Sequence, residues 1–415
     1  MSNWRFALHP STWLTPVAVL VMLGIALPGV YLGGTLDPQG NLENMPVALV
    51  IEKQTVDLGQ DSAAKALADT ITRSLDGDKF DLIRLDPTEE RKRFDRGTID
   101  GAIRIPADFD AQVSRLLDPR PGDAVTATVH LDTTQRVGAM TTGLFTGNTA
   151  PMLEGVRTAF GQDLAARTEG AHSTAEATAL ANPFSVHVAP LVPLEENTGL
   201  GTSVFYYAIV LVLLGFVGAS AIHPLIDSSL GFIPHEVGPR VRRREYRPLS
   251  RMKTLAIKWA CLCSAAPLAA AATETVAGPG LGMPVESPVE LWLFSTLTIA
   301  AIGSAALTVF AIFGAFAPLV NMFLFVALAM TSSGGAVPLE ATPSFFRMVA
   351  SFETMRPIVE GLRSILYLGS TKGSGLGDSA FHLGVLLALA LGLGAALTAA
   401  FDRVESFSRH PESAA

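Results

Sequence analysis

Long apolar stretches, each close to the length of a bilayer crossing, recur along this chain of 415 residues. A transmembrane helix needs roughly 17–25 mainly apolar residues. Six stretches meet this requirement, and we predict a membrane-spanning helix in each: 16–32, 203–226, 255–273, 290–313, 316–333 and 380–401. The fourth and fifth stretches are separated by only two residues, so they predict a tight helical hairpin.

The first apolar stretch, 16–32, has two interpretations. A cleaved signal peptide would carry a cleavage site with small residues directly after its apolar region. Residues 35–39 offer no such site, and Pro28-Gly29 interrupts the stretch only near its end. We therefore interpret 1–34 as an N-terminal segment with an uncleaved transmembrane helix.

Residues 35–200 show a different pattern, in which short apolar runs alternate with amphipathic stretches. Candidate strands are 46–52, 80–85, 101–105 and 124–131, and candidate helices are 64–75, 87–96, 106–117 and 133–169. The Ala-rich stretch 171–181 is either a further helix or a flexible return. Repeated alternation of strand and helix is typical of an α/β layer fold. The sequence thus predicts an α-helical polytopic membrane protein of six transmembrane helices, with an α/β domain between the first two.

Charge sets the expected orientation. Residues 35–200 contain 15 Lys and Arg against 25 Asp and Glu, whereas the loop 227–253 holds seven cationic residues and the loop 276–288 holds none. Positively charged loops stay in the cytoplasm. We therefore expect a bacterial plasma-membrane protein whose two termini and basic loop are cytoplasmic, whose domain 35–200 is extracytoplasmic, and whose residues 201–415 form a five-helix transmembrane domain. The acidic domain argues against nucleic-acid binding.

The segment 334–378 is too polar and too rich in Gly and Pro to span a membrane, and we predict short amphipathic or re-entrant helices on the outer surface. The residues that define the pattern of this segment are Gly334, Gly335, Pro338, Pro343, Phe345, Phe346, Pro357, Arg363 and Gly369. Glycine and proline also punctuate ordinary loops, which is the alternative interpretation. A second motif, Pro106, Asp108 and Phe109, follows the third candidate strand. Pro and Asp are also common in the first turn of a helix.

Together these two motifs resemble the ABC-2-type membrane permeases, in particular the YhgE/Pip (phage infection protein) family, over nearly the whole chain. The resemblance implies a permease subunit of an exporter, which dimerises, is driven by a separate ATP-binding-cassette subunit, and moves an amphiphile or envelope component. It equally allows a non-transporting scaffold of envelope assembly or secretion, or a phage receptor, whose outer domain binds partners. The domain here is shorter than in many members of that family.

The chain lacks the motifs of an enzyme. It contains no phosphate-binding P-loop, no nucleophile elbow and no zinc-binding H-E-x-x-H helix, so we expect neither catalysis nor a cofactor. If an ATPase drives the protein, the basic loop is the expected contact, through Arg242, Arg243, Arg244, Tyr246 and Leu249. The alternative is that these arginines only fix the orientation and touch anionic lipid of the bilayer.

Ionisable residues inside the predicted spans lie near span ends: His223, Lys258, Glu274, Glu290 and His382. Lys258 is expected to extend its ammonium group to the inner surface. No chain of such groups at depth is evident, so the sequence predicts no proton relay. Small residues in the spans, such as Gly215, Gly303, Gly384, Gly392 and Gly394, fit either packing within one bundle or a homodimer interface.

Overall fold

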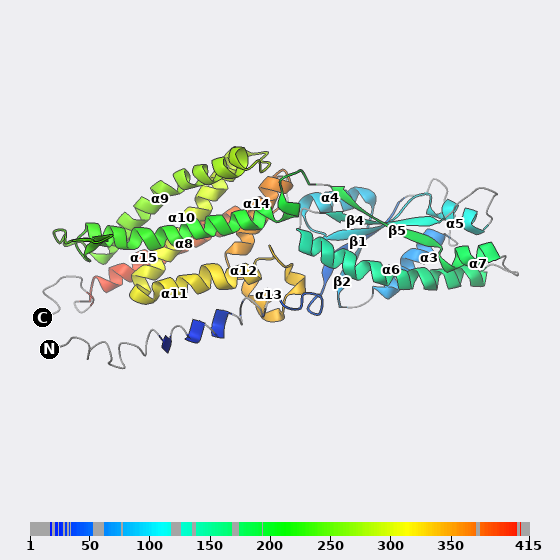
Figure 1. The fold of residues 1–415 in the computed structure, drawn as a ribbon, viewed down its shortest axis with the longest axis horizontal. Coiled ribbons are helices and arrows are strands. Elements are labelled where there is room, and N and C mark those ends of the chain that lie inside the picture. The colour runs from blue at the N-terminus through cyan, green and yellow to red at the C-terminus, as the bar shows by residue number, and fades with distance from the viewer. Residues whose placement is uncertain are drawn as a thin grey trace.

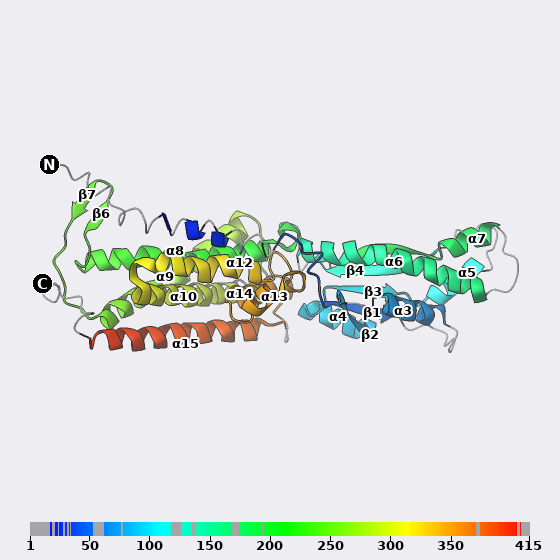
Figure 2. The same cartoon turned by 90° about the horizontal axis from the view of Figure 1, so that it is seen from below.

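A computed structural model describes scattered positions between residues 17 and 33, and then residues 35–52, 62–75, 78–117, 126–134, 138–167, 174–192, 194–370, 374–404 and 407. In this part of the chain the molecule is elongated, with a helical bundle at one end and a sheet domain at the other (Figure 1). Figure 2 shows the same arrangement from below, with the two halves end to end. Most of the first predicted span, 16–32, falls outside the described residues.

The sheet domain is built on five strands in the order β2-β1-β3-β4-β5. The strands are β1 (Met45–Ile51), β2 (Phe80–Leu85), β3 (Gly101–Ile105), β4 (Ala127–Thr134) and β5 (Phe184–Val192). Neighbouring strands pair in parallel except β3 and β4, which are antiparallel. The sequence predicted four of these strands and missed β5, which forms one edge of the sheet.

Helices cover both faces of the sheet because alternate strand residues point to opposite sides. The helices are α3 (Ala63–Ser74), α4 (Pro87–Arg96), α5 (Phe109–Leu117), α6 (Ala139–Arg167) and α7 (Thr174–Ala181). Val47 and Leu49 of β1 belong to the core that also contains side chains of α3, α5, α6 and α7. Ala48 and Val50 belong to a smaller core under Phe94 of α4.

The helix α5 begins later than the sequence predicted. It starts at Phe109, so Pro106 and Asp108 precede the helix and do not form its first turn. The Pro106 carbonyl accepts the Phe109 N–H, and the Asp108 carboxylate accepts the Gln112 side-chain amide at 2.8 Å. The Phe109 ring is fully buried. The motif thus shapes the entry of α5 and anchors it in the core.

The bundle contains four helical stretches that are long and apolar enough to cross a membrane, among the described residues. They are Ser203–Ser229, Arg251–Gly280, Pro288–Ser332 and Leu376–Phe401. The corresponding long helices are α8 (Ser203–Ser229), α9 (Arg251–Thr275), α10 (Pro288–Phe313) and α15 (Leu376–Phe401). Their starts and ends lie within a few residues of the predicted spans.

The third stretch folds back on itself, as the predicted hairpin requires. The helix α10 ends at Phe313, and the next residue, Gly314, has a φ of 54°, which favours glycine. The chain then returns through α11 (Ala317–Met322), a π-helical turn (Phe323–Ala327) and α12 (Leu328–Ser332). We call residues 317–332 the returning arm. The Asn321 side chain donates to the Ala306 carbonyl at 3.3 Å, which ties the arm to α10.

Several small residues are used for packing inside the bundle. A Cβ atom on Gly303 would lie 2.5 Å from a Leu262 methyl group, and one on Gly394 would lie 2.6 Å from the Trp259 ring. These positions therefore need glycine for close helix contact. A Cβ on Gly384 or Gly392 would meet no atom within 4 Å, so the packing of this chain does not require glycine at either position.

A charged cluster lies on the α4 face of the sheet. The Arg104 guanidinium on β3 pairs with Glu52 at 3.2 Å, with Glu90 at 3.0 Å and with Asp132 at 2.6 Å. The Glu90 side chain is fully buried on α4. Burial raises the pKa of Glu90 from 4.5 to about 7, although the Arg104 charge opposes this. One cation therefore faces three carboxylates, and Glu90 is the most deeply buried of them.

We expect the stability of the protein to fall as the pH rises from about 4.5 to about 7, because folded Glu90 holds its proton over this range and unfolded Glu90 does not. The Glu90→Gln variant should lose about 3 kcal/mol of this pH dependence, at 1.36 kcal/mol per pKa unit. Chemical unfolding at several pH values measures it. Glu89→Gln, on the neighbouring position of α4 where the side chain is 35% exposed, is the matched control and should keep the slope. An unchanged slope in Glu90→Gln would contradict the assignment.

Candidate functional site

The segment between the returning arm and α15 forms short helices, as predicted. They are a 3₁₀ turn (Leu339–Ala341), α13 (Ser344–Ala350) and α14 (Met355–Tyr367). One face of α14 is apolar and buried in the bundle core, through Ile358, Val359, Leu362, Ile365 and Leu366. Its other side carries Arg356, Glu360 and Arg363. A helix with this pattern packs by one face and leaves its polar face for a second contact.

The polar face of α14 meets the sheet domain at a cavity of about 160 Å³, which we call the junction cavity. Three of the predicted signature residues line it: Gly334, Pro338 and Arg363. The sheet domain contributes Asp100, from the loop before β3. Burial, together with the nearby Glu340 carboxylate, raises the pKa of Asp100 to about 7, and the Arg363 charge opposes this rise. Burial also lowers the pKa of the Arg363 guanidinium.

The sheet domain is held to this segment by both backbone and side chains. The Glu43 N–H donates to the Glu340 carbonyl at 2.7 Å, and the Arg347 guanidinium pairs with the Glu43 carboxylate at 2.5 Å. Val337 and Ala341 are buried within the sheet domain's main core. Part of the signature segment thus belongs structurally to the domain predicted as 35–200.

The other signature residues shape the segment itself. A Cβ on Gly335 would lie 2.4 Å from the Phe205 ring, so this approach to α8 requires glycine. Pro343 precedes α13, and the Phe346 ring is buried while the neighbouring Phe345 is half exposed. Gly369 follows α14 with a φ of 61°. By contrast, the motif at Pro106, Asp108 and Phe109 lies beside α5 at the far end of the sheet domain (Figure 1).

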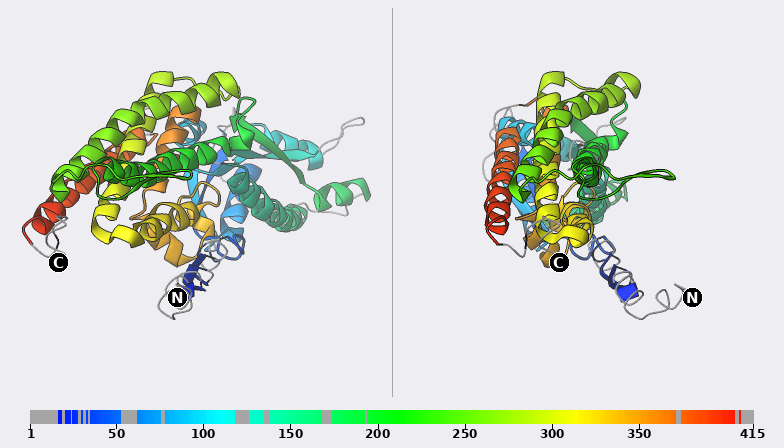
Figure 3. Two further views of the ribbon diagram at one scale, coloured as in Figure 1. Left: turned by 60° about the vertical axis from the view of Figure 1, so that its left-hand side comes forward. Right: turned by 90° about the vertical axis from the view of Figure 1, so that its left-hand side faces the viewer.

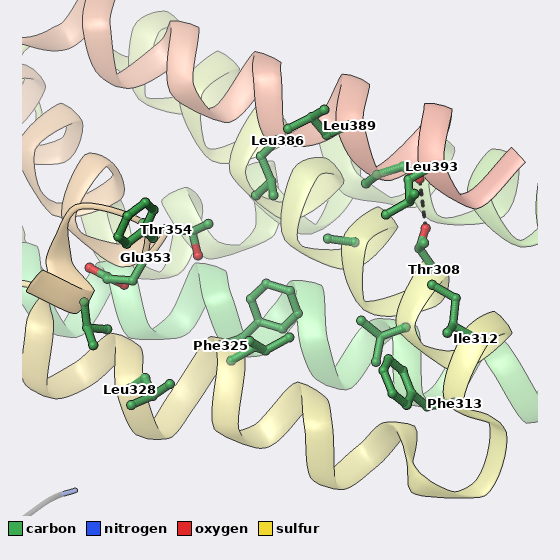
Figure 4. Close-up of a pocket in the computed structure, with 16 residues that line it drawn as sticks. Thr308, Ile312, Phe313, Phe325, Leu328, Glu353, Thr354, Leu386, Leu389 and Leu393 are labelled. Carbon is green, nitrogen blue, oxygen red and sulfur yellow. Dashed lines mark hydrogen bonds between the residues drawn. The ribbon is translucent and has the colours of Figure 1, made fainter. Parts of the chain in front are cut away.

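On the side of the bundle, two adjoining cavities form what we call the groove. The first has a volume of about 540 Å³ and lies between α10, the returning arm and α15. Figure 4 shows Leu386, Leu389 and Leu393 of α15 across the cavity from Phe325 and Leu328 of the returning arm. The lining is apolar apart from Thr308, Glu353 and Thr354. The Thr308 hydroxyl donates to backbone carbonyls, so it presents little polarity to the cavity.

The second cavity of the groove has a volume of about 520 Å³ and shares five lining residues with the first: Phe352, Glu353, Thr354, Leu386 and Leu389. It adds the polar side chains Arg356, Glu360, Asp378 and His382. The groove therefore has one apolar end and one polar end. Phe352 is 84% exposed and Leu389 is 63% exposed, so the groove opens sideways from the bundle.

Glu353 lies where the two ends of the groove meet. Its carboxylate accepts the N–H groups of Met355 and Arg356, both at 2.7 Å, at the start of α14. These bonds satisfy amide groups that the helix leaves unpaired at its N-terminus. Burial raises the pKa of Glu353 to about 7 in spite of the two hydrogen bonds. A proton-accepting group thus faces the groove near neutral pH.

Arg356 and Glu360 connect the groove with the junction cavity. They form an ion pair at 2.7 Å, one helical turn apart on α14, and both line both sites. The helix α14 therefore lies between the groove and the sheet domain and contributes side chains to both contacts. The sequence placed Arg363 and Pro357 in this region but gave no signal for the groove, because its lining residues come from positions between 305 and 393.

The basic loop lies at the opposite end of the bundle. It contains a short hairpin of β6 (His235–Val237) and β7 (Arg240–Arg242), which projects from the bundle (Figure 3). Arg242, Arg243 and Arg244 are exposed. The Tyr246 ring packs edge-on against the Phe232 ring, with 5.6 Å between the ring centroids, and Leu249 is partly buried. Tyr246, predicted to contact a partner, thus makes a contact within its own loop.

Lys258 does not extend to the surface as the sequence interpretation expected, because its side chain is only 3% exposed. It pairs instead with Asp227 at 2.7 Å. The sequence analysis did not single out Asp227, which is one helical turn after His223. Among the described residues, no group of three or more His, Cys, Asp or Glu side chains is arranged to hold a metal ion.

Comparison with known proteins places these features in a family. No curated protein matches the chain. The family described as protein of unknown function (DUF3533) matches residues 16–391, which include the sheet domain, most of the bundle, the junction cavity and all of the groove lining except Leu393. Since this match covers most of the sequence, the chain belongs to the DUF3533 family.

Proposed function

We propose that this protein is the membrane-spanning permease subunit of an ABC-2-type exporter, which moves an amphiphile or envelope component outward. The groove is the observation that supports the proposal most strongly. Its apolar end suits a hydrocarbon chain, and its polar end suits a head group. The signature segment that resembles ABC-2 permeases forms one wall of this groove.

The two ends of the groove make different energetic contributions. A hydrocarbon chain gains little by leaving lipid for the groove, because lipid tails are as apolar as leucine. A head group at the bilayer side of the bundle is costly unless polar side chains receive it. Arg356, Glu360, Asp378 and His382 supply such side chains. The polar end would therefore supply most of the selectivity.

We expect the Leu389→Trp variant to block binding of a photoreactive phospholipid analogue, because Leu389 lines both cavities of the groove and a larger ring fills them. The measurement is cross-linking yield to the purified full-length protein in lipid nanodiscs, which should fall by about tenfold, equal to roughly 1.4 kcal/mol. Leu268→Trp is the control, since Leu268 is exposed on α9 and lines neither cavity. Equal labelling of both variants would argue against the groove as a binding site.

The alternative function is a non-transporting scaffold of the cell envelope whose outer domain binds partners. The sheet domain favours it in one respect: it has its own core and projects from the bundle (Figure 2). For a scaffold, filling the groove at Leu389 would leave both partner binding and envelope phenotype unchanged, so the same variant separates the two functions.

The proposed orientation has six spans, with 1–34 and 201–415 providing them, both termini in the cytoplasm and 35–200 outside a bacterial plasma membrane. The basic hairpin and the sheet domain lie at opposite ends of the bundle, which suits this arrangement (Figure 2). In a variant without the native Cys261 and Cys263, a cysteine at Glu154 should react with a membrane-impermeant maleimide in intact cells. A cysteine at Arg243 should react only after lysis. Labelling of this position in intact cells would show that the orientation is the opposite of the one proposed.

The proposed exporter is a homodimer that binds a separate ATPase through the basic loop. Because Tyr246 packs on Phe232, the exposed residues Arg242, Arg243 and Arg244 are the better contact. Replacing these three by Gln should remove co-purification of an ATP-binding-cassette protein, whereas replacing them by Lys should retain it in part, since Lys keeps the charge. If the Gln variant still binds the ATP-binding-cassette protein, the loop is not the ATPase contact. It would then serve only as an orientation signal and a contact for anionic lipid.

A further inference from the structure

Three ionisable side chains meet inside the bundle, near the end that carries the basic loop. His223 and Asp227 lie one turn apart on α8, and Lys258 reaches them from α9. The Lys258 ammonium lies 2.7 Å from one Asp227 oxygen and 3.1 Å from His223 Nδ1. His223 Nε2 lies 3.3 Å from the other Asp227 oxygen. Ionisable groups within membrane-spanning helices are costly and usually functional.

These distances assign a protonation state to the cluster. An ammonium group can only donate hydrogen bonds, so His223 Nδ1 must accept from Lys258. A neutral imidazole that accepts at Nδ1 carries its proton at Nε2, which lies 3.3 Å from the Asp227 carboxylate. The cluster in this arrangement consists of one cation, one anion and a neutral ring, with no net charge.

A second proton on His223 is incompatible with the observed contacts. It would occupy Nδ1, which would then point one N–H at the three N–H groups of Lys258. Two donors and two positive charges would face each other at about 3 Å, so the ammonium would have to move away. As long as Lys258 keeps its own proton, protonation of the ring and the Lys258–His223 contact therefore exclude each other.

The surroundings of the cluster allow a proton to arrive. A cavity of about 10 Å³, roughly the space of one water molecule, adjoins His223 and Lys258. It is lined on the basic-loop side by Arg251 and Thr254 of α9 and by Thr398 of α15. Arg251 and Thr254 lie toward the same end of the bundle as the basic loop.

The described residues that line this cavity include two further charged side chains. From α9 come Lys258 and Arg251, and the Arg251 N–H is bound to Asp402, which follows α15. The helix α10 contributes the Phe310 ring, stacked on the imidazole at 4.6 Å, together with Leu307 and Ala311. The helix α15 contributes Thr398. Thus Asp227, Lys258 and the more distant Arg251 are the charged groups at this site among the described residues that line it.

We propose that His223, Asp227 and Lys258 form a proton-binding switch between α8 and α9. A proton from the aqueous phase at the basic-loop end binds His223 Nδ1, and the Lys258 ammonium moves away from the ring. The cluster gains one positive charge, and no other bond forms or breaks. The Lys258 contacts with Asp227 and His223 join α9 to α8, so we expect this displacement to shift α9 relative to α8. The proposal is independent of what occupies the groove.

The adjacent Trp259 reports such a shift. Its indole N–H donates to the Ser304 carbonyl of α10 at 3.3 Å, so a movement of α9 changes its environment. The experiment uses the full-length protein in lipid nanodiscs, with Phe in place of Trp4, Trp13 and Trp292. We expect the Trp259 emission to change between pH 8 and pH 5.5. An emission that stays constant over this range overturns the proposal.

Variants then separate the switch from other pH effects. His223→Gln should abolish the change in emission and take up about one proton fewer per chain, as measured with a pH indicator. His187→Gln, an exposed position on β5, is the control and should keep the change in emission. The pair Asp227→Asn with Lys258→Met removes both charges and so leaves no unpaired ion in the bundle. This double variant should also lose the response; a persistent response in it, or in His223→Gln, overturns the proposal.

Discussion

The architecture depends on the two-sided use of one helix, α14. Its apolar face is fixed in the bundle by Ile358, Leu362 and Ile365, which are fully buried. That fixed face leaves its polar residues directed at the sheet domain and at the groove, where unpaired polar groups would be costly. The sheet domain also binds the segment just before α14. The packing of α14 in the bundle therefore helps to set where the sheet domain lies relative to the bundle.

The groove illustrates how backbone amide groups at a helix start are satisfied. The first amide groups of a helix have no partner within the helix and need other acceptors. Glu353 does this at the start of α14 by accepting two amide N–H groups. The same carboxyl is then available at the meeting point of the apolar and polar ends. A structural requirement has thus placed an ionisable group where a ligand would encounter it.

Local patterns predicted the elements well, and non-local contacts account for what they missed. The bounds of β2, α4 and β3 were predicted to the residue, since each is enclosed by its own turn or capping residues. The strand β5 was missed, although Phe184, Val186 and Val188 alternate with other residues. Pro190 within the strand and the Ala-rich stretch before it weaken the strand pattern. The junction cavity, the groove and the Lys258–Asp227 pair depend on residues far apart in sequence. In addition, the sequence pattern of apolar residues that line a groove is the same as that of apolar residues that face lipid.

Arg356 and Glu360 belong to both the groove and the junction cavity, and this sharing has a thermodynamic consequence. Any ligand of the groove that rearranges this ion pair changes the contact that the sheet domain makes with α14. By linkage, a partner that binds the sheet domain and alters the same contact changes the affinity of the groove by an equal factor. In the proposed exporter, the sheet domain would thereby respond to a ligand in the groove, and a partner bound to the sheet domain would change the affinity of the groove.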